Sequence, residues 1–196
     1  PLSSLVGACR EYTGLERLHL VSRLDRETSG VVILAKRPSV ARQLQKAMEK
    51  QQAEKLYLAI LRGEMAEPLH VNAPLGRDTQ SLVHVRQAVR QDGIGKSAET
   101  LFTPIRSAKG YTFARVQILT GRKHQIRAHA AAIGYPVGGD RKYGSRDANR
   151  RLRQVGLKRL FLHAFELELK HPQTGQRLTV NAAMPDELME VLRGLS

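Results

Sequence analysis

Alternating apolar and polar positions predict most strands of this chain, because alternation places successive side chains on opposite faces of a sheet. Residues 31–36 form an apolar run that Pro38 ends, which predicts a buried strand. The alternating segments are residues 55–61, 111–119, 161–170 and 176–182.

Three other segments repeat apolar residues at helical spacing. The first begins at Ser39, which would cap it, and frays around Lys50 to Ala53. The second covers residues 123–133 and ends at Gly134, and the third covers residues 186–195. The apolar face of the first helix consists of Val40, Leu44, Ala47 and Met48.

Two segments lack a clear period. Glycines and prolines punctuate residues 64–98, which we expect to form hairpins or loops with little core. Residues 135–159 carry many Gly, Asp and Arg residues and predict a surface loop. Strands outnumber helices and no βαβ repeat recurs, so the pattern predicts an α+β fold with a mixed, mainly antiparallel sheet, in one domain over residues 1–196.

The net charge indicates a class of partner. The 196 residues include 32 Lys and Arg against 18 Asp and Glu, a formal charge of +14 with a pI of about 10.5. Such an excess attracts polyanions, and nucleic acid is the commonest polyanion in a cell. A basic but merely solvated surface would give the same count.

Cysteine and hydropathy indicate the compartment. The single cysteine, Cys9, excludes an internal disulfide and fits a reducing environment. No apolar stretch is long enough to span a bilayer, and the first residues lack the shape of a signal peptide. We therefore expect a cytoplasmic monomer without a membrane partner.

Familiar metal and cofactor motifs do not occur in the sequence. Residues 93–97 invite comparison with a phosphate-binding loop, but Arg90 stands where that motif needs its first glycine, so a basic turn fits better. His124 and His129 are five residues apart on a predicted helix and do not share a face, and no other Cys or His pair completes a metal site. We expect neither a metal nor a cofactor.

Residues 22–30, Ser-Arg-Leu-Asp-Arg-Glu-Thr-Ser-Gly, concentrate polar groups just before the first predicted strand. Arg23 and Arg26 flank Asp25, and their charge would keep its carboxylate ionised, as a nucleophile requires. The Thr28 and Ser29 side chains would fix the turn through hydrogen bonds to the backbone. A solvated turn with an incidental ion pair would have the same composition.

Residues 120–129, Thr-Gly-Arg-Lys-His-Gln-Ile-Arg-Ala-His, place basic side chains at the start of the second predicted helix. The free N–H groups and the dipole of the helix add to their charge, which favours a seat for phosphate or carboxylate. Arg127 would reach inward to a carboxylate such as Asp25. A basic, solvated helix face is the alternative.

Taken in order, these segments resemble the signatures of the RluA-type RNA pseudouridine synthases. Residues 22–36 are similar to that family's His-Arg-Leu-Asp-Arg-Asp-Thr-Ser-Gly and the strand that follows it. Residues 55–63 resemble its Lys-x-Tyr-x-Ala strand, and residues 120–129 its Thr-Gly-Arg-x-His-Gln-Ile-Arg-x-His motif. Shorter matches are Gly134-Tyr135-Pro136, Gly139-Asp140, Tyr143-Gly144, Phe161-Leu162-His163-Ala164 and His171-Pro172.

The resemblance implies an isomerase that converts uridine to pseudouridine in ribosomal or transfer RNA without a cofactor. Asp25 would cleave the glycosidic bond, by attack at the ribose C1′ or at the base, or through a glycal-type intermediate. Arg127 would pair with Asp25, and Tyr57 would lie against the flipped base and assist proton removal. The RNA-binding residues would be Arg23, Arg26, Arg122, Lys123 and His124.

The sequence also departs from the family's pattern. Ser22 and Tyr135 stand where the family usually has His, and Glu27 where it often has Asp. Residues 1–18 do not supply the family's upstream strand with Asn-Lys-Pro-x-Gly. We therefore expect a catalytic domain that lacks this strand and the S4-type RNA-binding domain.

Two other functions fit the same residues less well. A basic RNA-binding module would share the fold, but a retired enzyme has no reason to keep Asp25, Tyr57 and Arg127 together. A hydrolase that uses Asp25 would need a second acid or base, which is hard to place in this sequence.

Overall fold

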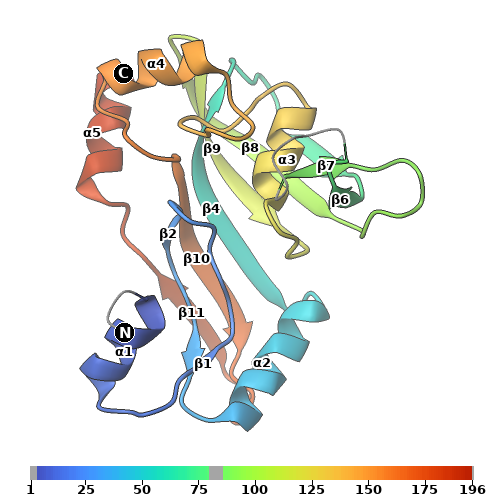
Figure 1. Ribbon diagram of the computed structural model, residues 1–196, viewed down its shortest axis with the longest axis vertical. Helices are drawn as coiled ribbons and strands as arrows, with labels where there is room; N and C mark the ends of the chain where they lie inside the picture. Colours follow the sequence, from blue (N-terminus) through green and yellow to red (C-terminus); the bar gives the residue numbers. More distant parts are fainter. Residues whose placement is uncertain (1–3, 80–85, 196) are drawn as a thin grey trace.

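The computed structural model describes residues 4–79 and 86–195, and within them a seven-stranded sheet forms the centre of the molecule (Figure 1). Six antiparallel strands follow one another in the spatial order β11 (Arg177–Asn181), β10 (Leu162–Lys170), β4 (Ala53–Arg62), β9 (Tyr111–Ile118), β8 (Glu99–Ala108) and β5 (Leu69–Asn72). The seventh strand, β2 (Ser29–Gly30), pairs with β10 in parallel. The predicted α+β class with a mixed, mainly antiparallel sheet is confirmed.

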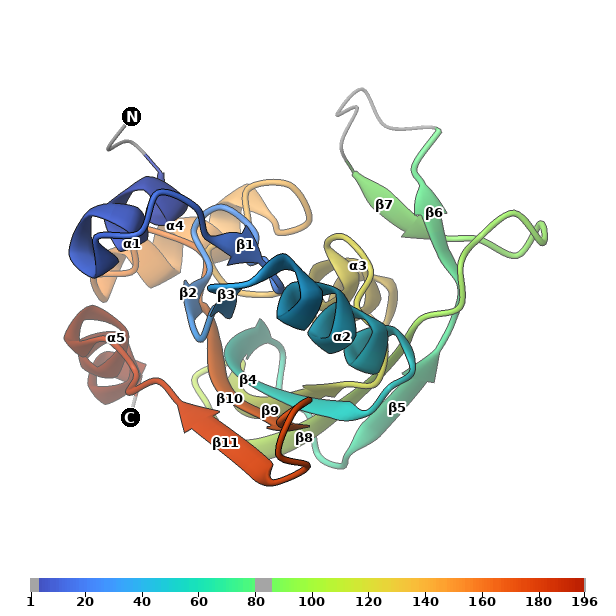
Figure 2. The ribbon, with the colours of Figure 1, turned by 90° about the horizontal axis from the view of Figure 1, so that it is seen from below.

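Two short ladders and the helices surround this sheet. One ladder joins β1 (His19–Leu20) to β3 (Leu34–Ala35), and the other joins β6 (Leu75–Arg77) to β7 (Gln87–Val89). The helices are α1 (Leu5–Thr13), α2 (Pro38–Glu49), α3 (Gln125–Ala132), α4 (Arg146–Gln154) and α5 (Asp186–Leu195). Figure 1 shows β4 and β10 running most of the length of the molecule, and Figure 2 places α2 and α3 on the same side of the sheet. None of the helices in the described ranges is long and apolar enough to cross a bilayer.

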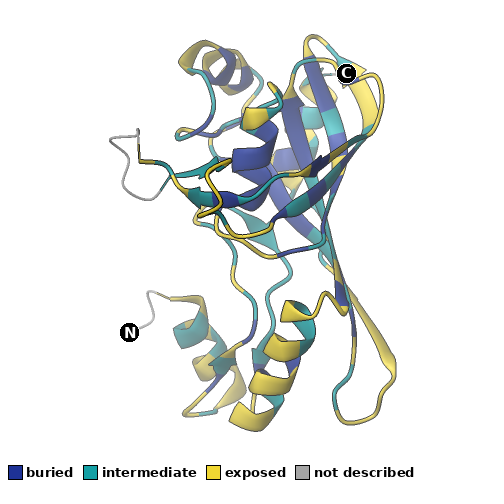
Figure 3. Cartoon of the chain, turned by 90° about the vertical axis from the view of Figure 1, so that its right-hand side faces the viewer, coloured by how far each residue is buried: buried dark blue, intermediate teal, exposed yellow. Residues whose placement is uncertain are grey.

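The hydrophobic cluster with the most buried residues lies where α3 packs on the sheet, and Figure 3 shows most of the buried residues in that half of the molecule. Phe102 and Val116 have no exposed surface there, and Ile126 of α3 joins the same cluster. Burying a side chain of this size stabilises the fold by about 1.5–3 kcal/mol. The start of α3 is therefore attached to a rigid layer.

Several predicted elements are confirmed with shifted ends. Strands 55–61, 111–119, 161–170 and 176–182 correspond to β4, β9, β10 and β11, and helix 186–195 is α5. The first helix is α2, but the predicted cap at Ser39 is wrong, because the helix starts at Pro38 after Arg37. The second helix, α3, starts only at Gln125, because His124 has a left-handed backbone with φ +54°.

Other predictions for the sequence are wrong. The expected strand over residues 31–36 is interrupted, because residues 31–33 leave the β10 edge before β3 pairs with β1. The expected surface loop over residues 135–159 contains α4, whose Leu152 is buried and whose N-terminus Ser145 caps. Residues 64–98 contribute short strands as expected, but also buried side chains such as Leu75. The part of that segment at residues 80–85 lies outside the described residues.

No prediction covered β8, although it is one of the two longest strands in the described part of the chain. Pro104 and Arg106 interrupt its apolar pattern, and its register with β9 shifts between them. A bulge at this point lets a proline stand inside the ladder.

Two glycines allow loops that carry polar side chains to come close to the backbone of neighbouring segments. Gly30 has φ +118°, and a Cβ there would lie 2.1 Å from the carbonyl oxygen of Ala164 on β10. Gly139 has φ +77°, and a Cβ there would lie 2.1 Å from the carbonyl oxygen of Arg159. Only glycine fits both places, which bring residues 22–30 and Asp140 close to the sheet.

Candidate active site

A pocket of about 640 Å³ opens between α2, the strands β4 and β10, and the loop that leads into α3. Residues 21–25 close one wall, Tyr57 lies on the sheet, and residues 120–127 form the opposite wall. The volume lies within the usual range of small-ligand sites, about 300–1,000 Å³. Of the residues predicted for the site, those that line the pocket are Arg23, Asp25, Tyr57, Arg122, Lys123, His124 and Arg127.

Asp25 lies in a turn between β1 and β2, with its side chain 23% exposed. Its backbone carbonyl accepts a hydrogen bond from the Thr28 amide, and Ser22 Oγ accepts one from the amide of Ile33 across the loop. The serine that replaces the family's usual histidine therefore ties the loop to Ile33, the residue just before β3. The carboxylate is left facing the pocket.

The turn is not held as the sequence predicted. Ser29 Oγ lies 2.9 Å from His163 Nδ1 and accepts from Arg159, so its partners are side chains rather than backbone. The described residues offer Thr28 Oγ1 no hydrogen-bond partner. A buried histidine of β10 thus positions the loop, and only the Leu-His-Ala match indicated it in the sequence.

Arg127 is the cation that contacts Asp25. Its Nη1 donates to Asp25 Oδ2 over 3.0 Å, which confirms the predicted pair across 102 residues of chain. The predicted source of charge beside Asp25 is corrected, because neither Arg23 nor Arg26 is among its ion-pair partners in the described ranges. Both arginines are exposed, and Arg26 is not among the residues that line the pocket.

A second aspartate, Asp140, holds the other edge of the same guanidinium. Arg127 Nε and Nη2 donate to its two carboxylate oxygens over 2.6 and 2.8 Å, a bidentate pair. The Asp140 side chain is fully buried, and its Oδ1 also accepts from the amides of Lys142 and Tyr143. Sequence reasoning did not include Asp140 among the site residues, and its only signal was the Gly-Asp match.

The charge of Arg127 is strongly stabilised. Burial acts to lower its pKa, but the hydrogen bonds and charges of Asp140, and then of Asp25, outweigh burial and raise the pKa. The guanidinium also lies 5.2 Å from the ring centroid of Tyr143, within range of a cation–π contact. Arg127 is therefore a fixed cation with one N–H group directed at Asp25.

The loop before α3 is fastened by one glutamine. Gln125 Oε1 accepts from Thr120 Oγ1 and from the Arg122 amide, while its Nε2 donates to the Glu99 carbonyl and to Thr100. This clamp joins the loop to β8. It presents Arg122 and Lys123 at the pocket wall, both exposed.

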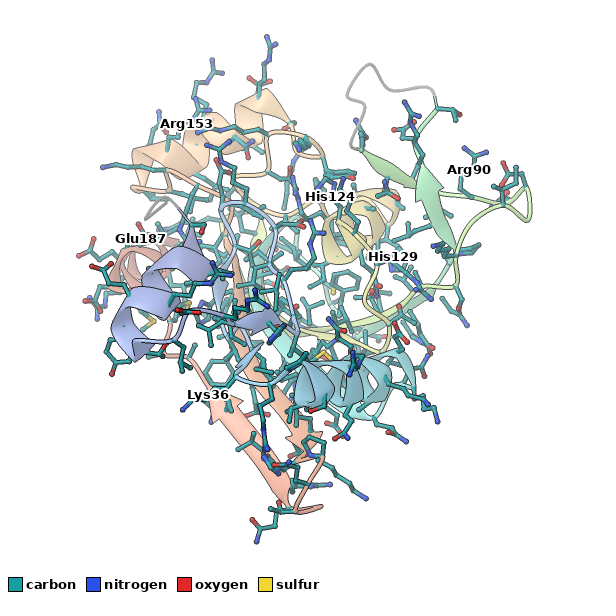
Figure 4. All side chains as sticks on the ribbon, turned by 60° about the horizontal axis from the view of Figure 1, so that its bottom comes forward. Lys36, Arg90, His124, His129, Arg153 and Glu187 are labelled. Carbon is teal, nitrogen blue, oxygen red and sulfur yellow. The ribbon has the colours of Figure 1, made fainter. Side chains whose placement is uncertain are left out.

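His124 lies inside the site rather than on its surface. Its side chain is 6% exposed, and its Nε2 lies 3.9 Å from Asp25 Oδ2. Figure 4 shows it beside α3 in the crowded middle of the molecule, whereas Arg90 and Arg153 lie at the outer edges. As a residue that binds RNA, it would meet only a nucleotide that enters the pocket.

Tyr57 is a protonated phenol at ordinary pH. Burial, and then the charge of Asp25, raises its pKa to about 12. The absorbance of tyrosinate after rapid pH jumps measures the titration. We expect the parent protein to show a step near pH 12 that the Tyr57→Phe protein lacks. The exposed control, Tyr12→Phe, should leave the step near pH 12 in place.

The raised pKa of Tyr57 also predicts how the stability of the protein depends on pH. The unfolded chain loses the phenol proton at about pH 10 and the folded chain at about 12, so the contribution of Tyr57 is complete below pH 10 and is lost as the pH rises through 12. A Tyr57→Phe protein should lose less stability over this interval. A step near pH 10 in Tyr57 itself would contradict this account.

In residues 4–79 and 86–195, no group of three or more His, Cys, Asp and Glu side chains is arranged to hold a metal ion. The two histidines of the loop and helix have separate partners, since His129 Nδ1 lies 2.9 Å from Thr100 Oγ1 while His124 lies beside Tyr143. The sequence predicted both histidines on one helix, but only His129 lies in α3, because His124 precedes the helix.

Known proteins provide an independent comparison. A family model described as RNA pseudouridylate synthase matches residues 5–132. The ribosomal large subunit pseudouridine synthase C of Pasteurella multocida is 38% identical over 91% of this chain and 54% of its own length. The protein of that name from Escherichia coli O157:H7 is 39% identical over 91% of this chain and 56% of its own length. The chain thus spans about half the length of the curated relatives it matches.

Solved structures agree with these sequence matches. Human RNA pseudouridylate synthase domain containing 1 has a TM-score of 0.79 at 25% identity, covering 93% of this chain and 74% of its own. Human RNA pseudouridylate synthase domain containing 4 has a TM-score of 0.76 at 27% identity, covering 97% of this chain and 81% of its own. The sequence matches and the structural matches therefore both consist of proteins named as pseudouridine or pseudouridylate synthases.

Proposed function

The chain belongs to the RNA pseudouridylate synthase family, and from that premise we propose that it isomerises uridine to pseudouridine in ribosomal RNA, with Asp25 as the nucleophile. The names of its relatives support ribosomal RNA as the substrate class. The observation that carries the proposal is the Asp25 carboxylate, paired with Arg127 over 3.0 Å in the wall of a pocket of about 640 Å³.

The proposed reaction rearranges one nucleotide without a net exchange of atoms. Asp25 breaks the N1–C1′ bond, by attack at C1′ or at the base or through a glycal, and C5 of the freed uracil then bonds to C1′. Any bond that Asp25 formed to the sugar or the base is broken again, which restores the carboxylate. The proton on C5 leaves, and N1 takes up a proton. Because these atoms are inaccessible in stacked RNA, the uridine has to be flipped into the pocket, and Arg23 would fill the gap it leaves.

Arg127 and Tyr57 would support this reaction in different ways. Arg127 pairs with the carboxylate and would hold it in its orientation in a partly closed pocket. Tyr57, with a pKa of about 12, would lie against the base as a neutral phenol. It would assist removal of the C5 proton only by passing on its own proton, since a resting phenolate is disfavoured.

Contacts with the RNA backbone would surround the pocket mouth. Lys123 is exposed there, and its charge would release counterions from a phosphate when RNA binds. We expect Lys123→Ala to weaken RNA binding about threefold to tenfold at low salt and to reduce the slope of log K against log salt by about 0.7–0.9. Filter binding over a salt series measures both quantities.

Lys170→Ala is the matched control for Lys123, because Lys170 is exposed at the far end of β10. It carries the same charge change and should leave the affinity and the slope close to those of the parent. Equal effects of the two substitutions would mean that only net charge matters, and that the pocket mouth has no special share in RNA binding.

The enzyme activity is tested by mapping. Ribosomal and transfer RNA from cells with and without the gene would be compared by chemical pseudouridine mapping, and the purified full-length protein would be added back to the unmodified RNA. We expect a ribosomal site to disappear and to be restored in vitro. Restoration only in transfer RNA would replace the substrate class, and no modification of any RNA would leave the RNA-binding module as the better account.

The location follows from the same proposal, because a protein that modifies ribosomal RNA would act in the cytoplasm. We also propose, as a separate point, that it acts as a monomer. Size-exclusion chromatography with light scattering on the full-length protein tests the second point.

A further inference from the structure

His124 and Tyr143 form a buried pair that the chemistry proposed above does not use. His124 precedes α3 in a left-handed backbone conformation, and its side chain is held between Asp25 and Tyr143. Its ring meets the Tyr143 ring edge to face at a centroid distance of 5.7 Å, and its Nδ1 lies 3.0 Å from the phenol oxygen. A strained backbone around a packed imidazole suggests a role that the orientation of the ring serves.

The hydrogen bonds of Tyr143 decide which ring nitrogen of His124 carries the proton. The amide of Gln87 donates to the phenol oxygen over 2.7 Å, so that oxygen already acts as an acceptor. The phenol O–H then has His124 Nδ1 as its acceptor among the described residues. The proton of a neutral imidazole therefore belongs on Nε2.

The other end of the ring leads to the same assignment. Nε2 lies 3.9 Å from Asp25 Oδ2, and a lone pair facing a carboxylate would be repelled, whereas an N–H group is attracted. Burial lowers the pKa of His124, and the charges of Arg127, Lys142 and Lys123 lower it further against the opposing effect of Asp25. The ring is thus neutral near pH 7, with Nε2–H directed at Asp25.

Arg127 and His124 both direct an N–H group at the same oxygen of the Asp25 carboxylate. Arg127 Nη1 lies 3.0 Å from Asp25 Oδ2, and His124 Nε2 lies 3.9 Å from the same atom. The longer distance would shorten in the complex with substrate, as such contacts commonly do. Oδ1 is the oxygen that neither donor contacts, so it keeps the lone pairs that form the new bond.

On the basis of the proposed function, we propose that Tyr143 and His124 are positioning residues: the phenol fixes the Nε2–H tautomer, and His124 with Arg127 holds Asp25 Oδ2 so that Oδ1 attacks. The same pair connects the nucleophile to the β6–β7 ladder, because Gln87 is the first residue of β7. The guanidinium of Arg86 also lies over the ring of Tyr143, 5.0 Å from the ring centroid.

The tautomer is tested without any activity measurement. Long-range proton–nitrogen spectra of the full-length protein, labelled with ¹⁵N in its histidines, report which nitrogen of each ring is protonated. His124→Gln identifies the signal of His124 by its loss. We expect protonated Nε2 in the parent, and in Tyr143→Phe a shift of the Nδ1 resonance as its hydrogen bond disappears. An Nδ1–H ring in the parent overturns the proposal.

Kinetics test the positioning role. The amide nitrogen of Gln mimics Nε2 of histidine and that of Asn mimics Nδ1, so His124→Gln should keep most of kcat while His124→Asn loses about tenfold. Tyr143→Phe should also lose roughly tenfold in kcat with KM within about twofold. Equal losses in the Gln and Asn variants would overturn the proposal.

Tyr111→Phe is the matched control for Tyr143. Tyr111 is also a buried tyrosine that donates through its phenol, but its acceptor is the Ala148 carbonyl, away from the pocket. Thermal unfolding of both variants separates loss of fold from loss of orientation. Equal kcat losses in folded Tyr143→Phe and Tyr111→Phe proteins would overturn the positioning role. A parent protein with the Nε2–H tautomer but no activity on any RNA would instead count against the proposed function.

Discussion

Asp25→Asn is expected to abolish pseudouridine formation, with a loss of at least roughly 10³-fold in the single-turnover rate. The amide has nearly the same shape but lacks the charge and the nucleophilic oxygen that the reaction requires. Folding should change little, because the side chain is 23% exposed and Arg127 keeps its bidentate pair with Asp140. Release of tritium from C5-labelled uridine in RNA, with the full-length enzyme in excess, measures the rate.

The control for this change is Asp147→Asn on α4, whose side chain is 75% exposed and paired only with Arg150 among the described residues. It makes the same chemical substitution away from the pocket and should react at the parent rate. RNA binding by Asp25→Asn should stay within about threefold of the parent, since phosphate contacts dominate affinity. Substantial turnover by Asp25→Asn would remove Asp25 from the role of nucleophile.

Asp140→Asn is expected to destabilise the protein by about 3–5 kcal/mol, because it leaves Arg127 buried with one of its two counter-ions removed. The asparagine also cannot accept from both Arg127 nitrogens and from the amides of Lys142 and Tyr143. Any folded fraction should turn over at least about tenfold more slowly, because Nη1 of Arg127 is no longer directed at Asp25. Urea unfolding measures the first effect and single-turnover kinetics the second.

An exposed ion pair on the surface is the control for the buried pair of Asp140. Arg159 donates to Glu187 over 2.7 Å, but the Glu187 side chain is 60% exposed, so Glu187→Gln should cost less than about 1 kcal/mol. If the two substitutions destabilised the protein equally, the buried bidentate pair would contribute no more to stability than an exposed ion pair. Normal turnover by Asp140→Asn would show that Arg127 keeps its orientation without that pair.

Local patterns in the sequence predicted much of the fold. Alternation is a property of neighbouring residues, so β4, β9, β10 and β11 were predictable from it. The pattern failed where a long-range partner replaces local regularity. β8 tolerates Pro104 because a bulge there lets the strand continue between β9 and β5, and α4 shows only a narrow apolar face amid its arginines.

The sequence likewise predicted one part of the site and missed another. Asp25, Tyr57 and Arg127 were recognisable in the sequence because each lies in a motif whose residues are close together in the chain. The sequence also predicted that Asp25 and Arg127 would pair, and the structure confirms this at 3.0 Å. Arg23 and Arg26 were predicted to supply charge beside Asp25 because they are its neighbours in the chain, yet neither is among its ion-pair partners in the described residues.

By itself, the sequence determined the fold class, the family and the place of Asp25 as a candidate residue of the site, because these depend on residue type and local spacing. Only the tertiary structure decided how that carboxylate is held. Asp140 shares Arg127 with it, and Tyr143 and Gln87 set the proton on His124. Those contacts join segments that are distant in the chain. Their geometry depends on burial and on the few places where Gly30 and Gly139 let the backbone approach, which no local pattern contains.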